Sequence, residues 1–302
     1  MMTPKSLQQL FDQGENISAT LRDQLGVDHN TQEVIEKSYD IQTGSYIAAL
    51  EKPSMLQHKA DYTSEIARVI LSLCQPHTIL EAGVGEATTL QGVMQKLGDQ
   101  ISYHGFDISW SRLAYARRWL NTQKVSQPIF CTGDLFNIPY LDNTFDVVYT
   151  SHSIEPNRGD EKKILEELFR VTKNYLILLE PGYELCDDTA RQRMDEHRYC
   201  RQLQQTALTL NYQVLRHELF PFSSNPQNPT AITIIKKNSS STSHHRYIFA
   251  CPKFKTPLLK IDENYFSEEA LVVYPSLAGI PCLRIENGIF ASKYQEIIED
   301  ST

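Results

Sequence analysis

The stretch ILEAGVGEATTL, residues 79–90, indicates the fold class of this chain. A short apolar run ends at Glu81, Gly83 and Gly85 follow, and a helix-compatible sequence starts at Glu86. Glycines at a strand-to-helix turn let the backbone approach a ligand, because they carry no Cβ. The free amide groups and the partial positive charge of a helix N-terminus favour a nucleotide-like ligand. We predict a cofactor-binding turn here, and the alternative is an ordinary tight turn.

Three more strand-like runs follow this turn, and each has polar residues at its end. Residues 102–109 include Asp107, which stands 22 positions after the second glycine. That is close to the spacing of about 20 at which an acid meets the ribose hydroxyls of a bound nucleotide. Residues 128–140 include Asp134, and residues 144–156 hold the fourth run. Any one acid could be a helix N-cap, but ligands of parallel α/β sheets bind at the edge where such strands end.

Taken together, the motifs EAGVGEATT, GFDIS, TGDLFNIPYLDNTFDVVYTSH and YLILLEPGY resemble those of class I S-adenosylmethionine-dependent methyltransferases. The resemblance covers about residues 61–237 and lies in the order and spacing of the motifs. It implies an α/β fold with a Rossmann-like, mostly parallel seven-stranded sheet and helices on both faces. It also implies S-adenosyl-L-methionine as the cofactor and S-adenosyl-L-homocysteine as the product. Ala87 replaces the common third glycine of the family, which is a frequent exchange.

The same resemblance implies which residues hold each part of the cofactor. The implied cofactor-binding residues are Glu81, Gly83 and Gly85 around the methionine part, Asp107 at the ribose hydroxyls, Ile108 and Leu135 against the adenine, Asp134 at its amino group, and Ser151 facing the methyl group.

The segment SHSIEPN supplies the candidate catalytic residues, His152 and Glu155. Methyl transfer depends mainly on aligning donor and acceptor, but a hydroxyl acceptor also benefits from a general base. A histidine can take a proton near neutral pH, and a carboxylate can orient it. In the alternative interpretation, His152 bonds only the backbone or the cofactor and Glu155 starts the next helix. The Asn/Asp-Pro-Pro-aromatic motif is absent, which disfavours adenine, cytosine and glutamine acceptors.

A polar helix predicted over about residues 189–210 carries several arginines, among them Arg191 and Arg198. Guanidinium groups bind carboxylates and phosphates in bidentate fashion. We therefore expect Arg191 and Arg198 to bind the substrate, a small anionic metabolite such as an acidic or nucleotide-linked sugar. The alternative is a solvated helix face.

The pattern along the chain divides it into four regions. Residues 1–59 are helical in pattern and are expected to fold over the cofactor as a lid, with Tyr39 and Tyr46 contacting it; helix packing is the alternative for either tyrosine. Residues 60–237 form the expected cofactor-binding domain, which ends in an antiparallel hairpin. The serine-rich composition of residues 238–246 predicts a flexible linker.

Residues 247–302 are expected to form a small α+β domain. They resemble the short zinc-ribbon-like proteins that activate tRNA and release-factor methyltransferases, through Cys251-Pro252, Tyr274-Pro275 and Gly279-Ile280-Pro281. Phe254 replaces the second cysteine of the pattern, and a structural zinc site needs about four ligands. We predict a degenerate ribbon without metal. It would cover apolar surface of the catalytic domain, cap the substrate cleft or form a homodimer contact.

Composition sets further limits on the function. The 302 residues are 41% hydrophobic and 22% charged, which is normal for a globular protein. The formal net charge of −8 argues against a nucleic-acid partner. No run approaches the roughly 20 apolar residues of a membrane span, and the N-terminus lacks a signal-peptide pattern. Six cysteines without framework spacing indicate reduced thiols. We therefore expect a cytoplasmic protein without membrane association.

The favoured interpretation is a methyltransferase that acts on an oxygen or nitrogen of a small metabolite. One alternative is a methyltransferase for tRNA or a protein, as the activator-like C-terminal region suggests. Another is a non-catalytic module that binds S-adenosylmethionine. A nicotinamide-dependent oxidoreductase is disfavoured by Thr88, which stands where the dinucleotide fingerprint has a third glycine, and by Glu81.

Overall fold

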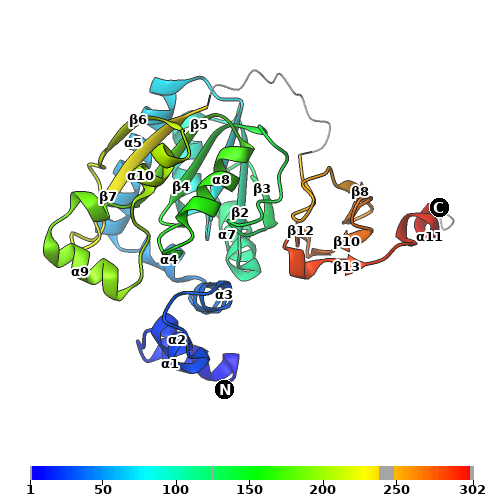
Figure 1. The fold of residues 1–302 in the computed structure, drawn as a ribbon, viewed down its shortest axis with the longest axis horizontal. Coiled ribbons are helices and arrows are strands. Elements are labelled where there is room, and N and C mark those ends of the chain that lie inside the picture. The colour runs from blue at the N-terminus through cyan, green and yellow to red at the C-terminus, as the bar shows by residue number, and fades with distance from the viewer. Residues whose placement is uncertain (1, 124, 238–247, 300–302) are drawn as a thin grey trace.

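A seven-stranded sheet forms the centre of the computed structural model, which describes residues 2–123, 125–237 and 248–299 (Figure 1). The strand order is β3-β2-β1-β4-β5-β7-β6, and β7 runs antiparallel to both of its neighbours. The predicted mostly parallel sheet and its closing hairpin are thereby confirmed. The strands are β1 Thr78–Ala82, β2 Ser102–Asp107, β3 Ile129–Thr132, β4 Phe145–Ser151, β5 Thr172–Pro181, β6 Gln213–Leu219 and β7 Thr230–Lys236.

Both faces of the sheet are covered by helices, because alternate residues of the buried strands point to opposite sides. In β1, Ile79 packs with the residues of α5 and α6, while Leu80 packs with those of α8. The apolar stripe of α5 at Ile66, Val69 and Ile70 has the spacing of one helix face and is buried. The covering helices are α5 Pro53–Leu73, α6 Thr88–Leu97 and α7 Trp110–Gln123 on one face, and α8 Glu161–Val171 and α10 Leu203–Thr209 on the other.

Four short helices precede the sheet and lie beside its carboxyl edge (Figure 1). The first three pack on one another through a small core that includes Leu7, Leu21 and Val34. The predicted boundary at residues 59 and 60 falls inside α5, because Pro53 occupies the first turn of that helix, where its missing N–H costs nothing. The four helices are α1 Pro4–Asp12, α2 Ile17–Leu25, α3 Gln32–Ile41 and α4 Ser45–Ala49.

The single polar helix predicted over residues 189–210 is wrong. The segment forms α9, Asp188–Glu196, and then α10 after a break. Arg198 and Gln202 adopt left-handed backbone angles, φ 59° and φ 58°, which end helical geometry. Between them, the Cys200 N–H donates to the Glu155 carbonyl oxygen at 2.7 Å. This tertiary contact outweighs helix continuity, and it brings the break beside the candidate catalytic loop.

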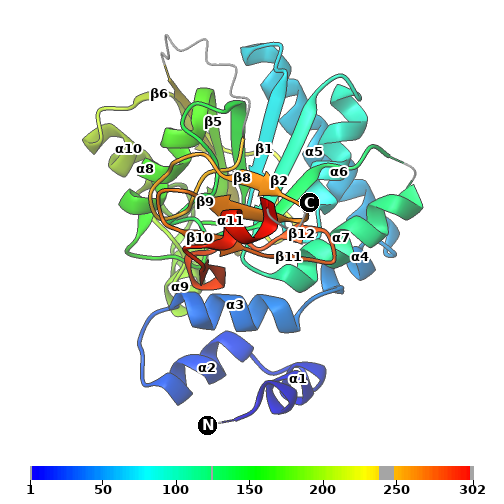
Figure 2. The ribbon, with the colours of Figure 1, turned by 90° about the vertical axis from the view of Figure 1, so that its right-hand side faces the viewer.

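The C-terminal residues form a separate antiparallel sheet of order β13-β10-β9-β8, which lies in front of the large sheet in Figure 2. Apolar residues of this C-terminal unit, among them Phe249, Leu258 and Leu283, join one buried cluster with Leu80 and Phe106 of the large sheet. The predicted linker, residues 238–246, lies outside the described residues. The C-terminal elements are β8 Leu259–Ile261, β9 Asn264–Ser267, β10 Val272–Tyr274, β11 Ser276–Leu277, β12 Ile280–Pro281, β13 Ile289–Phe290 and α11 Tyr294–Glu299.

The described residues contain neither a candidate membrane span nor a candidate metal cluster. None of their helices combines the length and apolar character needed to cross a membrane. No group of three or more His, Cys, Asp or Glu side chains among them is placed to hold a metal ion. Cys251 is buried, and its Sγ lies 3.7 Å from the Tyr274 hydroxyl.

Candidate active site

A cavity of about 350 Å³ lies at the carboxyl ends of β1 to β4. This is the edge at which a parallel sheet presents its loops to a ligand. The structure brings together here every residue predicted for the cofactor and for catalysis: Tyr39, Tyr46, Glu81, Gly83, Gly85, Asp107, Ile108, Asp134, Leu135, Ser151, His152 and Glu155.

The glycine turn is built for close backbone approach. Gly83 and Gly85 have φ of 72° and 53°, and a Cβ on Gly83 would meet the Ser153 Cβ at 2.3 Å. The Gly83 position therefore requires glycine for space as well as for conformation. The following helix, α6, begins at Thr88 rather than at Glu86, because Ala87 takes a left-handed angle of φ 55°.

Asp107 fixes the glycine turn from the end of β2. One carboxylate oxygen accepts the Gly85 N–H at 2.8 Å, and the other accepts the Ser109 N–H at 2.9 Å. Burial raises the pKa of Asp107, and the positive charge of Arg112 and the two amide bonds offset part of that shift. Similarly, Asp134 accepts the N–H groups of Phe136 and Asn137 at 2.7 and 2.8 Å.

Glu81 is a buried acid at the end of β1, and its carboxylate accepts the Tyr149 hydroxyl at 2.7 Å. Burial raises its pKa to about 8, while Tyr149 and the nearby Lys59 act in the opposite direction. Lys59 donates to the Thr89 hydroxyl at 3.0 Å, and burial lowers its pKa. Glu81 and Lys59 thus place a buried acid and a buried amine on the wall of the cavity.

His152 and Glu155 form a hydrogen-bonded pair on the loop after β4. His152 Nδ1 lies 2.5 Å from Glu155 Oε2, and His152 Nε2 lies 2.8 Å from the Thr230 hydroxyl. The Asn228 amide also donates to Glu155, at 3.0 Å. Burial lowers the pKa of His152, but the hydrogen bond and charge of Glu155 outweigh it and the net shift is upward. Neither alternative interpretation describes this geometry, because Glu155 precedes helix α8 by six residues and bonds the imidazole.

The backbone of His152 is strained, with φ 57°, an angle that side-chain-bearing residues rarely adopt. Glu180, at the end of β5, holds the loop in this form by accepting the N–H groups of Ser153, Ile154 and Glu155 at 3.0–3.1 Å. Burial raises the pKa of Glu180 to about 7. The Glu180 carboxyl group thus positions the imidazole of His152 through the backbone of the loop.

The N-terminal helices contribute aromatic groups to the cavity. The Arg112 guanidinium stacks between the rings of Tyr39 and Tyr46, 4.8 and 4.7 Å from their centroids. One terminal nitrogen of Arg112 is buried without a hydrogen-bond partner. Glu86 accepts the backbone N–H groups of Gly44 and Ile47 at 2.9 and 2.8 Å, which ties the start of α4 to the glycine turn.

Arg191 and Arg198 do not line the cavity. Arg191 donates to the carbonyl oxygens of Tyr183 and Cys186 and pairs with Asp188, so its guanidinium stabilises the start of α9. Arg198 is exposed at the break after that helix.

Sequence reasoning missed several polar residues of the cavity, among them Lys59, Arg112, Asn228 and Thr230. Arg112 had a local signal, since it lies in the first turn of the helix that follows Asp107. Lys59, Asn228 and Thr230 come from distant segments, and nothing in their local sequence separates them from solvated residues.

Comparison with known proteins relates part of the chain to methyltransferases. The family profile described as "Methyltransferase domain" matches residues 79–175. Norajmaline N-methyltransferase of Rauvolfia serpentina is 32% identical over 98 residues, 32% of each chain. Demethylmenaquinone methyltransferase of Bacillus mycoides (strain KBAB4) is 26% identical over 167 residues, 55% of this chain and 63% of that one. Each of these two relatives is matched over less than two thirds of its own length.

Among solved structures, magnesium protoporphyrin IX methyltransferase from Synechocystis PCC 6803, with bound SAH, has a TM-score of 0.48 and 16% identity. That likeness covers 61% of this chain and 84% of the other. The matched residues 79–175 run from the first strand through the glycine turn and the ends of β2, β3 and β4. By this match, residues 79–175 of the chain belong to a methyltransferase domain.

Proposed function

We propose that the protein transfers a methyl group from S-adenosylmethionine to an oxygen or nitrogen atom of a small polar metabolite. The observation that carries the proposal is the position of His152. Its imidazole lines the same cavity as the glycine turn, Asp107 and Asp134. A base and a cofactor site that share one cavity are what methyl transfer to an O–H or N–H group requires.

The residues present fit the cofactor. Gly83 and Gly85 leave the turn free of side chains, and Arg112 presents a buried, unpartnered nitrogen. We propose that Glu81 and Lys59 hold the methionine part, Asp107 the ribose and Asp134 the adenine. Bound there, S-adenosylmethionine supplies a methyl group that its sulfonium already activates.

The chain's own contribution is to orient the acceptor and to remove its proton. When Nδ1 of the neutral imidazole donates its proton to Glu155, Nε2 carries no proton and can accept one. Thr230 occupies Nε2 in this structure, at 2.8 Å, and an acceptor hydroxyl would replace that contact. The imidazolium that results is stabilised by the Glu155 carboxylate.

The acceptor class is a second part of the proposal. The cavity wall near His152 carries Asn225, Asn228 and Ser224, which suits a polar acceptor. The expectation of an anionic acceptor, such as a sugar derivative, depended on Arg191 and Arg198, which lie outside the cavity. Lys59 and Arg112 are cations that do line it. A screen for methyl acceptors should therefore include both anionic and neutral small metabolites.

The first experiment is calorimetry with S-adenosylmethionine and S-adenosylhomocysteine, with NADH as the control ligand. We expect both adenosyl ligands to bind and Asp107→Asn to weaken them at least about tenfold, or 1.4 kcal/mol. Transfer of a labelled methyl group is then screened over small anionic metabolites, small neutral metabolites, RNA and protein. Transfer of the labelled methyl group to RNA or protein would overturn the proposal that the acceptor is a small metabolite. Binding of the adenosyl ligands without transfer to any acceptor would favour a non-catalytic module.

A matched pair of variants tests the role of the base. His152→Ala should lower kcat while the affinity for S-adenosylhomocysteine stays within about twofold. His217→Ala is the control, because His217 bonds a threonine of β7, Thr233, in the same way but does not line the cavity. Equal activities of the two variants would remove His152 from the mechanism.

A further inference from the structure

Arg284 connects the C-terminal unit to the N-terminal helices. Its guanidinium pairs with Glu36 of α3 at 2.6 Å, and with Glu286 of its own loop. The Arg284 side chain is only 7% exposed, and its Nε is buried without a partner. Arginine is almost never fully buried unless it is paired, and Glu36 and Glu286 supply the pairing here.

The loop that carries Arg284 is fixed on the edge strand of the large sheet. The Leu283 N–H donates to the Thr132 carbonyl oxygen at 3.2 Å and lies 3.1 Å from the Thr132 hydroxyl. Thr132 ends β3, two residues before Asp134. The positive charge of Arg284 reaches Asp134, where it lowers the pKa of that carboxyl against the larger effect of burial. Arg284 therefore lies between α3 and the adenine end of the cavity.

Helix α3 carries its attachments on one face. Glu36 and Asp40 are four residues apart, and residues at that spacing lie one above the other. Asp40 accepts the hydroxyl groups of Ser109 and Ser111 at 2.7 and 3.1 Å, which ties α3 to the loop after Asp107. Tyr39, next to Asp40, lines the cavity. One turn of α3 is thus held by the catalytic domain and the preceding turn by the C-terminal unit.

We propose that Arg284 is a positioning residue that holds α3 over the adenosine end of the cavity, so that the C-terminal unit sets how long the cofactor stays bound. The inference rests on the proposed binding of S-adenosylmethionine. Loss of the Arg284–Glu36 pair removes one attachment of α3 and leaves those made by Asp40 and by the Arg112 bond to the Tyr39 carbonyl oxygen. Tyr39 then leaves the cavity wall more often.

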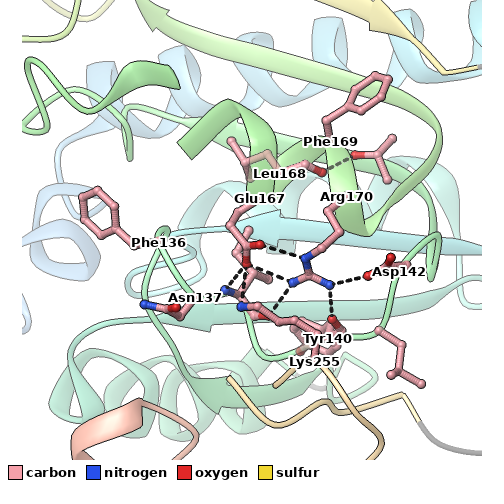
Figure 3. Close-up of polar contacts among 12 residues, drawn as sticks. Phe136, Asn137, Tyr140, Asp142, Glu167, Leu168, Phe169, Arg170 and Lys255 are labelled. Atoms are coloured by element: carbon pink, nitrogen blue, oxygen red, sulfur yellow. Dashed lines mark hydrogen bonds and ion pairs between the residues drawn. The ribbon is translucent and has the colours of Figure 1, made fainter. Parts of the chain in front are cut away.

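A second ion pair of the C-terminal unit provides the control. Lys255 bonds Glu167 of α8 at 2.9 Å, and Glu167 also bonds Arg170, which holds the loop at Tyr140 and Asp142 (Figure 3). Lys255 therefore attaches the same unit to the same domain without contacting α3. Its positive charge also reaches Asp134, as that of Arg284 does, so its replacement controls for both attachment and charge.

The test measures the dissociation rate of S-adenosylhomocysteine from the full chain by surface plasmon resonance. Arg284→Met keeps most of the side-chain volume and should raise the dissociation rate about tenfold, which corresponds to 1.4 kcal/mol. Lys255→Met should lower Tm but leave the rate within about twofold. Glu36→Gln should reproduce the effect of Arg284→Met, and the double variant should show no further increase. Arg284→Lys should recover most of the slow dissociation.

An unchanged rate in Arg284→Met, or the same rate in Arg284→Met and Lys255→Met, would overturn the inference. If Arg284→Met does not fold, Glu36→Gln decides, because the Glu36 side chain is 40% exposed and belongs to no buried cluster. A wild-type chain that binds no adenosyl ligand would instead overturn the proposed function on which the inference rests.

Discussion

The Nδ1 atom of His152 lies 2.5 Å from the Oε2 atom of Glu155, within one loop and three residues apart. The contact exists because His152 takes a left-handed backbone angle and Glu180 holds the next three amide groups. It assigns the Nδ1 proton to the Glu155 side and leaves Nε2 directed at Thr230 and the cavity.

The first prediction concerns the pKa of this imidazole. We expect the His152 pKa to lie above 6.5, the ordinary value of a histidine, because Glu155 stabilises the charged form more than burial destabilises it. Glu155→Gln removes that charge, and the pKa should then fall below 6.5. Heteronuclear NMR titration of the histidine side chains measures both values. An unshifted His152 in wild-type protein would contradict the geometry.

The same pair makes stability depend on pH. A folded-state pKa raised above the unfolded value stabilises the protein fully below the unfolded pKa, and that contribution is lost as pH rises through the folded pKa. The pKa of Glu155 is lowered despite burial, because His152 bonds it, so its contribution is present above its unfolded value of 4.5. The wild-type advantage over Glu155→Gln in the free energy of unfolding should therefore be largest between about pH 4.5 and 6.5. Urea titrations at about pH 5.5 and 8.5, inside and above that window, measure it, and a larger advantage at the higher pH would contradict the assignment.

A second prediction follows from the pKa of Glu81, which burial raises to about 8. At pH 7 this carboxyl is largely protonated, and it should ionise when the ammonium group of S-adenosylhomocysteine binds. Binding should then release up to about one proton, which makes the measured enthalpy more exothermic in Tris than in phosphate. Glu81→Gln should abolish the difference between buffers. Equal enthalpies in the wild-type protein would show that Glu81 is already ionised.

The third prediction compares two costs of replacing a glycine in the glycine turn: the steric overlap of a new Cβ and the strain of a positive φ. Gly83→Ala should destabilise the protein by about 1–3 kcal/mol beyond the cost of its backbone angle, because the new Cβ would overlap Ser153. Gly26→Ala is the control, since Gly26 also has positive φ, 64°, in the left-handed helical region, but open space around it. It should cost about 1–2 kcal/mol through conformation alone. Denaturant unfolding of both variants measures the difference, and equal losses would remove the steric argument.

A fourth prediction concerns Arg191. Its guanidinium bonds two carbonyl oxygens before α9, so Arg191→Ala should lower the free energy of unfolding by about 1–3 kcal/mol. The affinity for S-adenosylhomocysteine should not change, because Arg191 lies outside the cavity. Gln192→Ala, one residue further along α9 on an exposed position, is the control and should cost little. Weaker cofactor binding in Arg191→Ala alone would place the arginine closer to the site than this structure does.

The local sequence was sufficient for the sheet and for one half of the site. Glu81, Asp107 and Asp134 lie at or just after the ends of short apolar strands, and parallel strands must bring those ends to one edge. The positions of these acids therefore followed from the chain alone. His152 and Glu155 were also predictable as candidates, because they follow the fourth strand directly.

Contacts between distant segments decided the rest. The break between α9 and α10 depends on a hydrogen bond from the Cys200 N–H to the Glu155 carbonyl oxygen. The helical periodicity of the sequence does not predict this bond. Lys59 and Asn228 enter the cavity from a helix before the sheet and from the turn before β7. The pairing of Arg284 with Glu36 joins residues almost at opposite ends of the chain. Sequence pattern reports short-range periodicity, whereas such contacts arise only when packing of the whole chain brings the segments together.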